Sequence, residues 1–325
     1  MHKLRYKDIA DVAGKPQVKV GPRLDPYALH ESNCNIFEDV SSGITHKYPH
    51  TIRFALTDRC KHACPYCYEA GRVFGLDKDK KEGYPLEKRV SNVVAYYREH
   101  PEIYDIVLSG GEPLMLSNKQ LEFVFQSLSK IEHLRSVRFC TRSVVRDPDR
   151  IDGEFLALLD RFSERFAIRM VLHTVHPEEL TPKTKEVVRN LLRAGAVCFS
   201  QIPLLKGINL SDDIEASRAL VRSFLKRLNI CRIQPYYFVV KMAVFGTERF
   251  AMPLDKIMEI FRPLLQHDRD SIGLGLTFKL MAAAPETKVF LYPETKYRFD
   301  KDKGGYLISV SGREVFYPYE DPATL

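Results

Sequence analysis

The sequence lacks any uninterrupted apolar run near the ~20 residues that a membrane-spanning helix needs. It also lacks an export signal, because its first residues, MHKLRYKDIADVAGKPQ, are polar and mixed in charge. No basic stripe alternates with aromatic residues, and a net charge of +7 is only mildly basic, so a nucleic-acid partner is not indicated. These absences predict a cytoplasmic protein that does not enter a membrane.

The use of cysteine argues against a disulfide framework. The seven cysteines are odd in number and widely scattered apart from one group of three. Cytosolic thiols also stay reduced. Four isolated cysteines lie on or near apolar runs and are expected to be inert core thiols: Cys34, Cys140, Cys198 and Cys231.

The sequence does contain a regular alternation of strand-like and helix-like stretches. Its 325 residues are 45% hydrophobic and 28% charged, which is ordinary for a globular protein of one large domain or two medium ones. Periodicity predicts strands at 51–56, 103–108, 137–141, 166–174, 196–205 and 231–240. It predicts helices at 86–100, 117–130, 151–163, 179–194 and 212–227.

Repeated strand-helix units imply a parallel sheet, because crossover helices are what parallel strands require. The predicted fold class is α/β, a partial (β/α)6 TIM-like barrel with extensions at both ends. We expect an N-terminal extension at 1–50, a barrel core at 51–265 and a C-terminal extension at 266–325. Functional groups in such barrels gather at the C-terminal ends of the strands, where this sequence places its unusual residues.

Three cysteines follow the first predicted strand in the stretch DRCKHACPYC: Cys60, Cys64 and Cys67. A structural zinc site needs four ligands, and the sequence has no second cysteine pair to complete one. His62 is awkwardly placed between Cys60 and Cys64 for that purpose. A four-iron cubane cluster normally has four thiolate ligands, so three would leave one iron open to a substrate or cofactor. Zinc and redox-active thiols are the alternatives to such a cluster.

This loop resembles the three-cysteine loop of the radical S-adenosylmethionine (SAM) superfamily. The resemblance implies a [4Fe-4S] cluster, SAM chelated to the open iron, and cleavage of SAM to a 5′-deoxyadenosyl radical that takes a hydrogen atom from the substrate. Tyr66 is similar to the ring that the superfamily places near adenine. SGGEP after the second strand resembles its Gly-Gly-Glu edge, which implies that Gly110, Gly111 and Glu112 contact SAM.

A narrower resemblance, to the lysine 2,3-aminomutase family, covers most of the chain. That family includes the enzyme that β-lysylates elongation factor P. The similar segments are GITHKYPHTIRFALTDRC, TRSVVRDPDRI, HTVHPEELT, SQIPLLKGIN and RIQPYYFV. The resemblance implies that Arg142, His173 and Gln201 lie near SAM or a second cofactor. That cofactor is pyridoxal phosphate (PLP), held as a Schiff base by a lysine, here Lys288 in APETKVFLYP.

Several positions depart from the pattern of that family. Glu69 stands where the family has an arginine for the substrate carboxylate, and Arg72 would have to replace it. Met242 and Met281 stand where two aspartates receive the distal ammonium of lysine. The glycine run before the cofactor lysine is absent. Free lysine is therefore not the expected substrate.

The leading hypothesis is a radical SAM isomerase that shifts an amino group with the help of PLP, on an amino acid or amine other than free lysine. One alternative is a PLP-independent radical reaction, such as decarboxylation, dehydrogenation, epimerisation or C–C bond chemistry on a sugar, nucleoside or amine. Another is a protein that modifies, or merely binds, a protein or RNA. The leading hypothesis implies a small-molecule substrate and an electron donor such as flavodoxin or ferredoxin, and it is compatible with a homo-oligomer.

Overall fold

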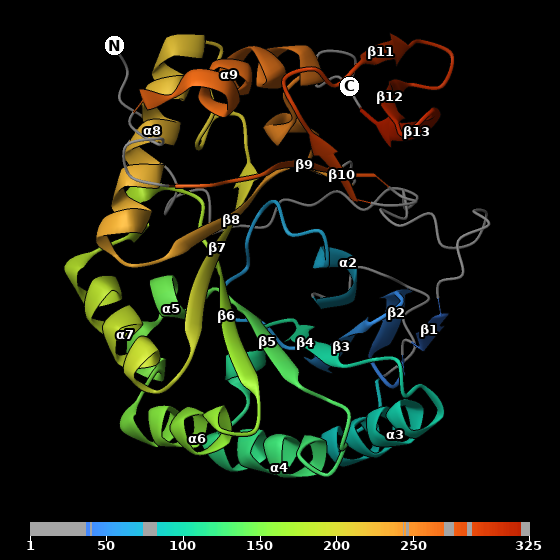
Figure 1. The fold of residues 1–325 in the computed structure, drawn as a ribbon, viewed down its shortest axis with the longest axis vertical. Helices are drawn as coiled ribbons and strands as arrows, with labels where there is room; N and C mark the ends of the chain where they lie inside the picture. Colours follow the sequence, from blue (N-terminus) through green and yellow to red (C-terminus); the bar gives the residue numbers. More distant parts are fainter. Residues whose placement is uncertain are drawn as a thin grey trace.

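A computed structural model describes residues 37–39, 41–73, 83–242, 244, 247–269, 276–284 and 288–319. Within these residues a 10-stranded sheet runs in chain order from β1 to β10, and a separate three-stranded sheet holds β11, β12 and β13 (Figure 1). No helix in this part of the chain is long and apolar enough to cross a bilayer.

The strands of the large sheet are β1 (Phe37–Asp39), β2 (Ile44–Tyr48), β3 (Thr51–Thr57), β4 (Asp105–Gly110), β5 (Ser136–Thr141), β6 (Ala167–His173), β7 (Val197–Leu204), β8 (Gln234–Val240), β9 (Leu280–Ala283) and β10 (Lys288–Leu291). Those of the small sheet are β11 (Tyr297–Asp300), β12 (Gly305–Val310) and β13 (Arg313–Pro318). The α-helices are α2 (Ala70–Val73), α3 (Leu86–Glu99), α4 (Asn118–Leu128), α5 (Ser143–Arg146), α6 (Gly153–Ser163), α7 (Pro182–Arg193), α8 (Ile214–Ile230) and α9 (Leu254–His267). Short 3-10 turns are η1 (Pro113–Met115), η2 (Pro148–Arg150), η3 (Pro177–Glu179) and η4 (Glu248–Phe250).

The six predicted strands are β3 to β8, and each pairs in parallel with the next. Strand β9 continues the parallel order beside β8, whereas β1, β2 and β10 are antiparallel additions at the two edges. In the described residues β1 and β10 are the edges and do not pair with each other, so the barrel stays open. The α/β class and the partial barrel are thus confirmed.

The edge strands come from the predicted extensions. Strands β1 and β2 lie within 1–50, and β9 and β10 lie within 266–325, yet all four belong to the same sheet as the core. The proposed boundaries at 50 and 265 stay predictions.

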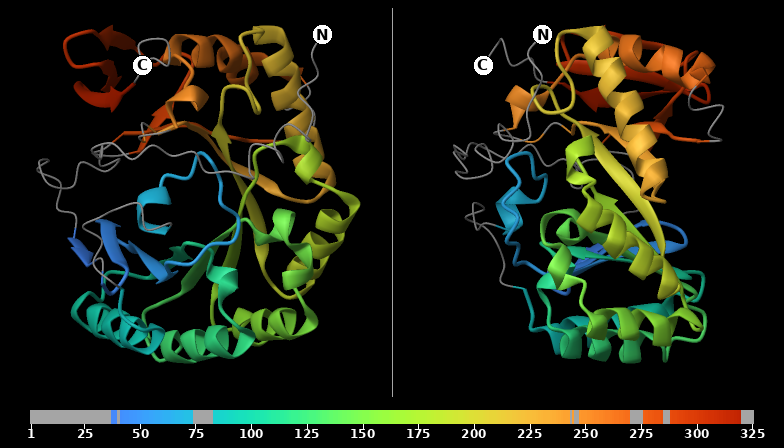
Figure 2. Two further views of the ribbon diagram at one scale, coloured as in Figure 1. Left: turned by 180° about the vertical axis from the view of Figure 1, so that it is seen from behind. Right: turned by 90° about the vertical axis from the view of Figure 1, so that its left-hand side faces the viewer.

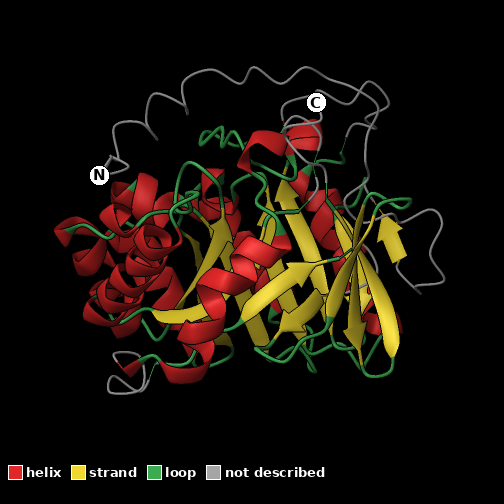
Figure 3. Cartoon of the chain, turned by 90° about the horizontal axis from the view of Figure 1, so that it is seen from above, coloured by secondary structure: helices red, strands yellow, loops and turns green. Residues whose placement is uncertain are grey.

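Helices cover one face of the curved sheet and leave the other face to the interior of the partial barrel (Figures 1 and 2). Phe139 of β5 contacts Phe125 of α4 and Phe155 of α6, with ring centroids 5.8 and 6.0 Å apart. Because side chains alternate along a strand, Arg138 and Cys140 of β5 point to the opposite, concave face. Seen from above, the strands fill the centre of the molecule while many of the helices gather at one side (Figure 3).

Capping side chains set where the helices begin after the loops. Ser117 and Gln120 form a capping box at the start of α4. Asp152, Thr181 and Asp213 accept a backbone hydrogen bond at the starts of α6, α7 and α8. Because these caps fix the first turn of each helix, they limit the conformations of the loops that connect the strands to the helices.

Candidate functional site

The three cysteines lie on one loop at the C-terminal end of β3. All three are free thiols and half-buried. Burial, followed by the neighbouring Cys64, raises the pKa of Cys67 to about 12. Burial also raises the pKa of Cys60, and Cys64 adds to that effect. The thiols are therefore close enough to interact, and a bound cation would reverse these shifts.

The described residues contain no group of three or more His, Cys, Asp or Glu side chains that could hold a single metal ion. Thiolates that bind different iron atoms of a cluster are spread around it, so the loop remains compatible with an iron–sulfur cluster.

Gly110 and Gly111 bring the end of β4 against the start of the cysteine loop. Gly111 N donates to Thr57 O at 2.7 Å, and Glu112 N donates to Arg59 O at 2.8 Å. A Cβ atom would lie 2.3 Å from Thr57 O at Gly110 and 2.2 Å from Arg59 O at Gly111. Gly110 also has a φ of 126°. Both positions therefore require glycine, the first for its conformation as well as for space.

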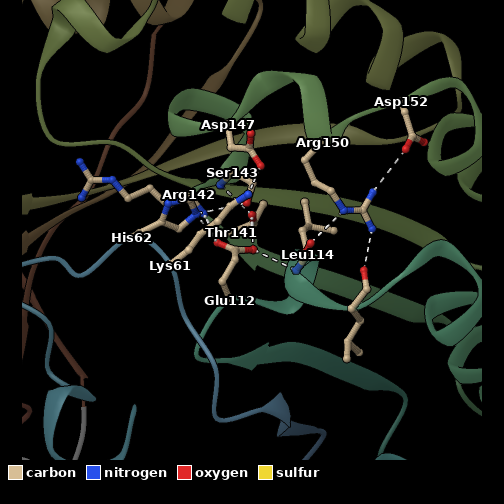
Figure 4. A network of polar contacts seen from close by, with 11 residues as sticks. Lys61, His62, Glu112, Leu114, Thr141, Arg142, Ser143, Asp147, Arg150 and Asp152 are labelled. Atoms are coloured by element: carbon tan, nitrogen blue, oxygen red, sulfur yellow. Dashed lines mark hydrogen bonds and ion pairs between the residues drawn. The ribbon is translucent and has the colours of Figure 1, made fainter. Parts of the chain in front are cut away.

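The Glu112 carboxylate joins three segments of the site (Figure 4). Its Oε1 accepts hydrogen bonds from Leu114 N at 3.1 Å and Thr141 Oγ1 at 2.7 Å. Its Oε2 accepts from Arg142 N at 3.0 Å and lies 3.2 Å from His62 Nε2. Glu112 thus fastens the ends of β4 and β5 to the cysteine loop, and its contact with SAM stays a prediction. His62 faces this carboxylate.

The Arg142 guanidinium reaches the cysteine loop from the end of β5. Nη1 donates to Cys64 Sγ at 3.1 Å, and Nη2 donates to Glu179 Oε1 at 2.6 Å. Burial alone lowers the pKa of Arg142, but Glu179 and Cys64 more than offset this, so the pKa is raised. The residue thus stays cationic beside the thiols.

A small apolar cluster underlies the loop, apart from the main core. It consists of Tyr66, Val175, Leu205, Ile208 and Phe250, with Cys64 packed against it. The Tyr66 ring stacks on His173 with centroids 5.8 Å apart and lies edge-on to Phe250 at 6.0 Å. The Arg142 guanidinium carbon is 5.6 Å from the centre of the Tyr66 ring. Cys64 therefore packs against a cluster that contains the aromatic rings of Tyr66 and Phe250.

Three atoms of this group are buried without a hydrogen-bond partner: Tyr66 Oη, Arg142 Nε and His173 Nε2. Burial, together with nearby Arg142 and His62, lowers the pKa of His173 to about 3, so its imidazole is neutral at physiological pH. Native proteins leave few buried polar atoms unpaired, and those that exist call for an explanation such as a ligand.

Gln201 lies next to His173 at the same end of the sheet. The two residues are register partners in β6 and β7, and Gln201 is also the partner of Tyr237 in β8. The structure therefore brings the predicted residues Arg142, His173 and Gln201 to neighbouring strand ends, as parallel strands require.

Lys288 begins β10, opposite Ala283 of β9. Much of the side chain is exposed, but its ammonium lies 5.7 Å from the centre of the Tyr48 ring and 5.6 Å from that of Tyr237. Burial of that end lowers the pKa of Lys288, and Arg138 also acts to lower it. The Tyr237 ring lies near this ammonium, and Tyr237 is also the register partner of Gln201. The predicted PLP lysine therefore faces the same barrel interior as Gln201.

Three of the residues that depart from the family pattern, Glu69, Met242 and Met281, lie within the described part of the chain. Glu69 Oε1 accepts from Arg53 Nη2 at 2.7 Å. Met281 of β9 is buried and Met242 is half-buried. The side chain of Arg72 lies outside the described residues, and so do residues 285–287 of the stretch 282–287, where the resemblance implies a glycine run.

Sequence reasoning missed Glu179 and Phe250. Glu179 belongs to the similar segment HTVHPEELT, so the resemblance marked its neighbourhood but not its bond to Arg142, which is 37 positions away. Nothing in the sequence pattern around Phe250 indicates that it meets Tyr66.

Comparison with known proteins gives one family match and several similar sequences. Residues 54–220 match the family model of the radical SAM superfamily. A putative L-lysine 2,3-aminomutase of Aquifex aeolicus is 33% identical over 247 residues, which make up 76% of this chain and 61% of that protein. The L-lysine 2,3-aminomutase of Fusobacterium nucleatum is 31% identical over 74% of this chain and 55% of its own length. The glutamate 2,3-aminomutase of Clostridioides difficile is 32% identical over 68% and 49%. The chain thus spans about half the length of the curated relatives that it matches.

Proposed function

This chain belongs to the radical SAM superfamily, and from that premise we propose that it uses a [4Fe-4S] cluster and SAM to remove a hydrogen atom from a small-molecule substrate. We further propose that PLP, bound through Lys288, assists the migration of an amino group to a neighbouring carbon. The substrate is an amino acid or amine other than free lysine. A donor such as flavodoxin or ferredoxin supplies the electron.

The three unpaired buried atoms beside the thiols carry this proposal. Tyr66 Oη, Arg142 Nε and His173 Nε2 belong to side chains in contact with one another, and Arg142 also contacts Cys64. SAM presents an amino group, a carboxylate, ribose hydroxyls and adenine nitrogens, which are suitable partners for such atoms. The donor and acceptor groups present therefore fit SAM.

When bound, the cluster and SAM supply a hydrogen-abstracting radical through one-electron cleavage of a C–S bond. Cys60, Cys64 and Cys67 would hold three of the four irons. The stacked rings of Tyr66 and His173 offer a flat surface for adenine. Gly111, which follows β4, and the Glu112 carboxylate keep the loop against the strand ends. In this proposal the protein mainly positions the cofactors.

The surroundings of Lys288 fit PLP. A lysine must be unprotonated to attack an aldehyde, and burial assisted by Arg138 and Lys47 lowers the pKa of Lys288. The rings of Tyr48 and Tyr237 near the ammonium offer stacking surfaces for a pyridine ring.

The charges of the barrel interior support a substrate other than lysine. Asp105 is paired with Arg138, and Glu69 is paired with Arg53. The position expected to face a distal ammonium, Met281, is buried and apolar. A buried ammonium without its own carboxylate is strongly disfavoured. Relatives named for lysine and for glutamate are about equally similar to this chain.

Anaerobic reconstitution tests the cluster. The wild-type protein should take up about four irons per chain. The triple variant Cys60→Ala, Cys64→Ala, Cys67→Ala should lose the iron, while Cys198→Ala, which removes a buried thiol away from the loop, should retain it. Full iron in the triple variant would refute the assignment.

Visible absorption tests the PLP part. Protein incubated with PLP should gain a Schiff-base band, and Lys288→Ala should abolish it. Lys279→Ala is the matched control, because Lys279 Nζ also lies near an aromatic ring, 5.1 Å from the centre of Phe290. Absence of the band in the wild type, together with intact SAM cleavage, would leave the PLP-independent radical reaction as the function.

A further inference from the structure

We infer that Arg142, anchored by Glu179, sets the reduction potential of the cluster by donating a hydrogen bond to the sulfur of Cys64. The inference rests on the proposed function, since it needs a cluster at the three cysteines. The distance from Arg142 Nη1 to Cys64 Sγ is 3.1 Å, which is within hydrogen-bond range for a sulfur acceptor. It assigns Arg142 a role toward the cluster itself, in addition to any contact with SAM.

The position of the guanidinium is fixed from several sides. Arg142 N donates to Glu112 Oε2 at 3.0 Å, and Nη2 donates to Glu179 Oε1 at 2.6 Å. The other oxygen of Glu179 accepts from Val175 N at 2.8 Å, so the carboxylate is itself held by the backbone after β6. The side chains of Arg142 and Glu179 are only 8% and 0% exposed. Because protein groups hold this donor in place, its orientation does not change when the charge of the cluster changes.

The direction of the effect follows from electrostatics. One-electron reduction adds negative charge to the cluster and to the sulfurs that ligate it. A hydrogen bond to a ligating sulfur therefore stabilises the reduced form more than the oxidised form and raises the potential. Arg142 thus makes the cluster easier to reduce.

The ion pair separates this hydrogen bond from a simple effect of charge. Arg142 and Glu179 are oppositely charged and 2.6 Å apart, so the pair adds no net charge beside the cluster. The contribution of the pair at Cys64 is a hydrogen-bond donor of fixed direction, the Nη1–H group of Arg142. A variant that removes both charges at once keeps the local net charge and loses this donor geometry.

The experiment compares reduction potentials of reconstituted clusters, measured by EPR-monitored redox titration without SAM. The double variant Arg142→Gln, Glu179→Gln should have a lower potential than the wild type. The control is Arg222→Gln, Asp268→Asn, which removes another ion pair, joined at 2.8 Å, outside the candidate site. Its potential should match that of the wild type.

A conservative variant covers the case in which the double variant fails to hold a cluster. Arg142→Lys keeps a cation for Glu179, but a single ammonium cannot bridge Glu179 and Cys64 as the fork does. It should shift the potential in the same direction by a smaller amount. Potentials equal to the wild type in either Arg142 variant would overturn the inference. Failure of the wild type to take up iron would instead overturn the proposed function.

Discussion

Glu69 and Arg53 meet at 2.7 Å, with side-chain exposures of 11% and 21%. The resemblance to the lysine 2,3-aminomutase family predicts an arginine at the position of Glu69. Because Arg53 compensates its charge, this glutamate does not act as an isolated negative group in the barrel interior. A substrate carboxylate therefore would not meet a bare negative charge at this place.

His173 should make the stability of the cofactor-free protein depend on pH. Its folded pKa of about 3 lies below the usual value of 6.5, so between these pH values the unfolded state binds more protons. Acidification through this window therefore lowers the free energy of unfolding, by at most about 1.4 kcal/mol per pH unit from this group. Urea unfolding at pH 6 and pH 4 should give a larger loss for the wild type than for His173→Asn. Equal losses would contradict the buried neutral imidazole.

Lys288 should react with PLP at a lower pH than an ordinary lysine. Its pKa is lowered by burial and by the nearby cations Arg138 and Lys47. A larger fraction of the amine is therefore unprotonated near neutral pH, and the Schiff-base band should reach half of its maximum below the usual pKa of 10.5. Titration of the visible absorbance measures this midpoint. Arg138→Gln should raise it, and an unchanged midpoint would contradict the role of that charge.

At the scale of elements, the site depends on contacts between the end of β4 and the cysteine loop. Gly111 N donates a hydrogen bond to Thr57 O, and Glu112 N donates one to Arg59 O. Both bonds join backbone atoms, so they require the two segments to approach closely. The same loop is tied to the end of β5 through Glu112 and Arg142. The position of the thiols is thus a property of three strand ends together.

Gly111→Ala should disturb this arrangement. The added Cβ would lie 2.2 Å from Arg59 O, so the loop must move, and the expected loss of stability is about 1–3 kcal/mol. Iron content after reconstitution should fall with it. Gly153→Ala is the matched control, because no atom lies within 4 Å of its Cβ at the start of α6. Normal iron and stability in Gly111→Ala would contradict the close approach.

The sequence predicted the central elements because their periodicity reflects one buried face. Strand β5 is an example: Val137 and Phe139 face the helices, and Arg138 and Cys140 alternate with them. The short edge strand β10 gave no such signal, since four residues that include Lys288 do not display a period. Helix α9 was also not predicted, although it packs Phe261 against Phe238 of β8.

At the scale of the whole molecule, the open sheet places its two ends near each other. Lys288 of the edge strand β10 lies 5.7 Å from the ring of Tyr48 in β2, although these strands are not paired. This proximity allows residues from the two predicted extensions to face the interior of one barrel. The candidate PLP lysine thus belongs to the same structural unit as the cysteine loop.

Cofactor binding should therefore stabilise the entire barrel. A ligand that binds only the folded protein adds about 2.7 kcal/mol at a concentration of 100 Kd. SAM added anaerobically to the cluster-loaded protein should raise Tm, as followed by differential scanning fluorimetry. The triple cysteine variant should show no rise, and an equal rise in that variant would place SAM elsewhere.

Local motifs of the site could be predicted from the sequence, whereas contacts between distant segments could not. The cysteines and the Gly-Gly-Glu stretch are local motifs, so their residues could be named from the sequence. The Arg142–Glu179 pair and the Tyr66–Phe250 contact join distant segments, and only the folded sheet brings them together. The substrate depends on the whole interior surface, which no single motif encodes.

Release of 5′-deoxyadenosine from SAM tests the central claim most directly. Reconstituted, chemically reduced protein should form 5′-deoxyadenosine, detected by liquid chromatography with mass spectrometry, and the triple cysteine variant should form none. A wild-type protein that carries about four irons per chain but releases no 5′-deoxyadenosine under these conditions would contradict the account.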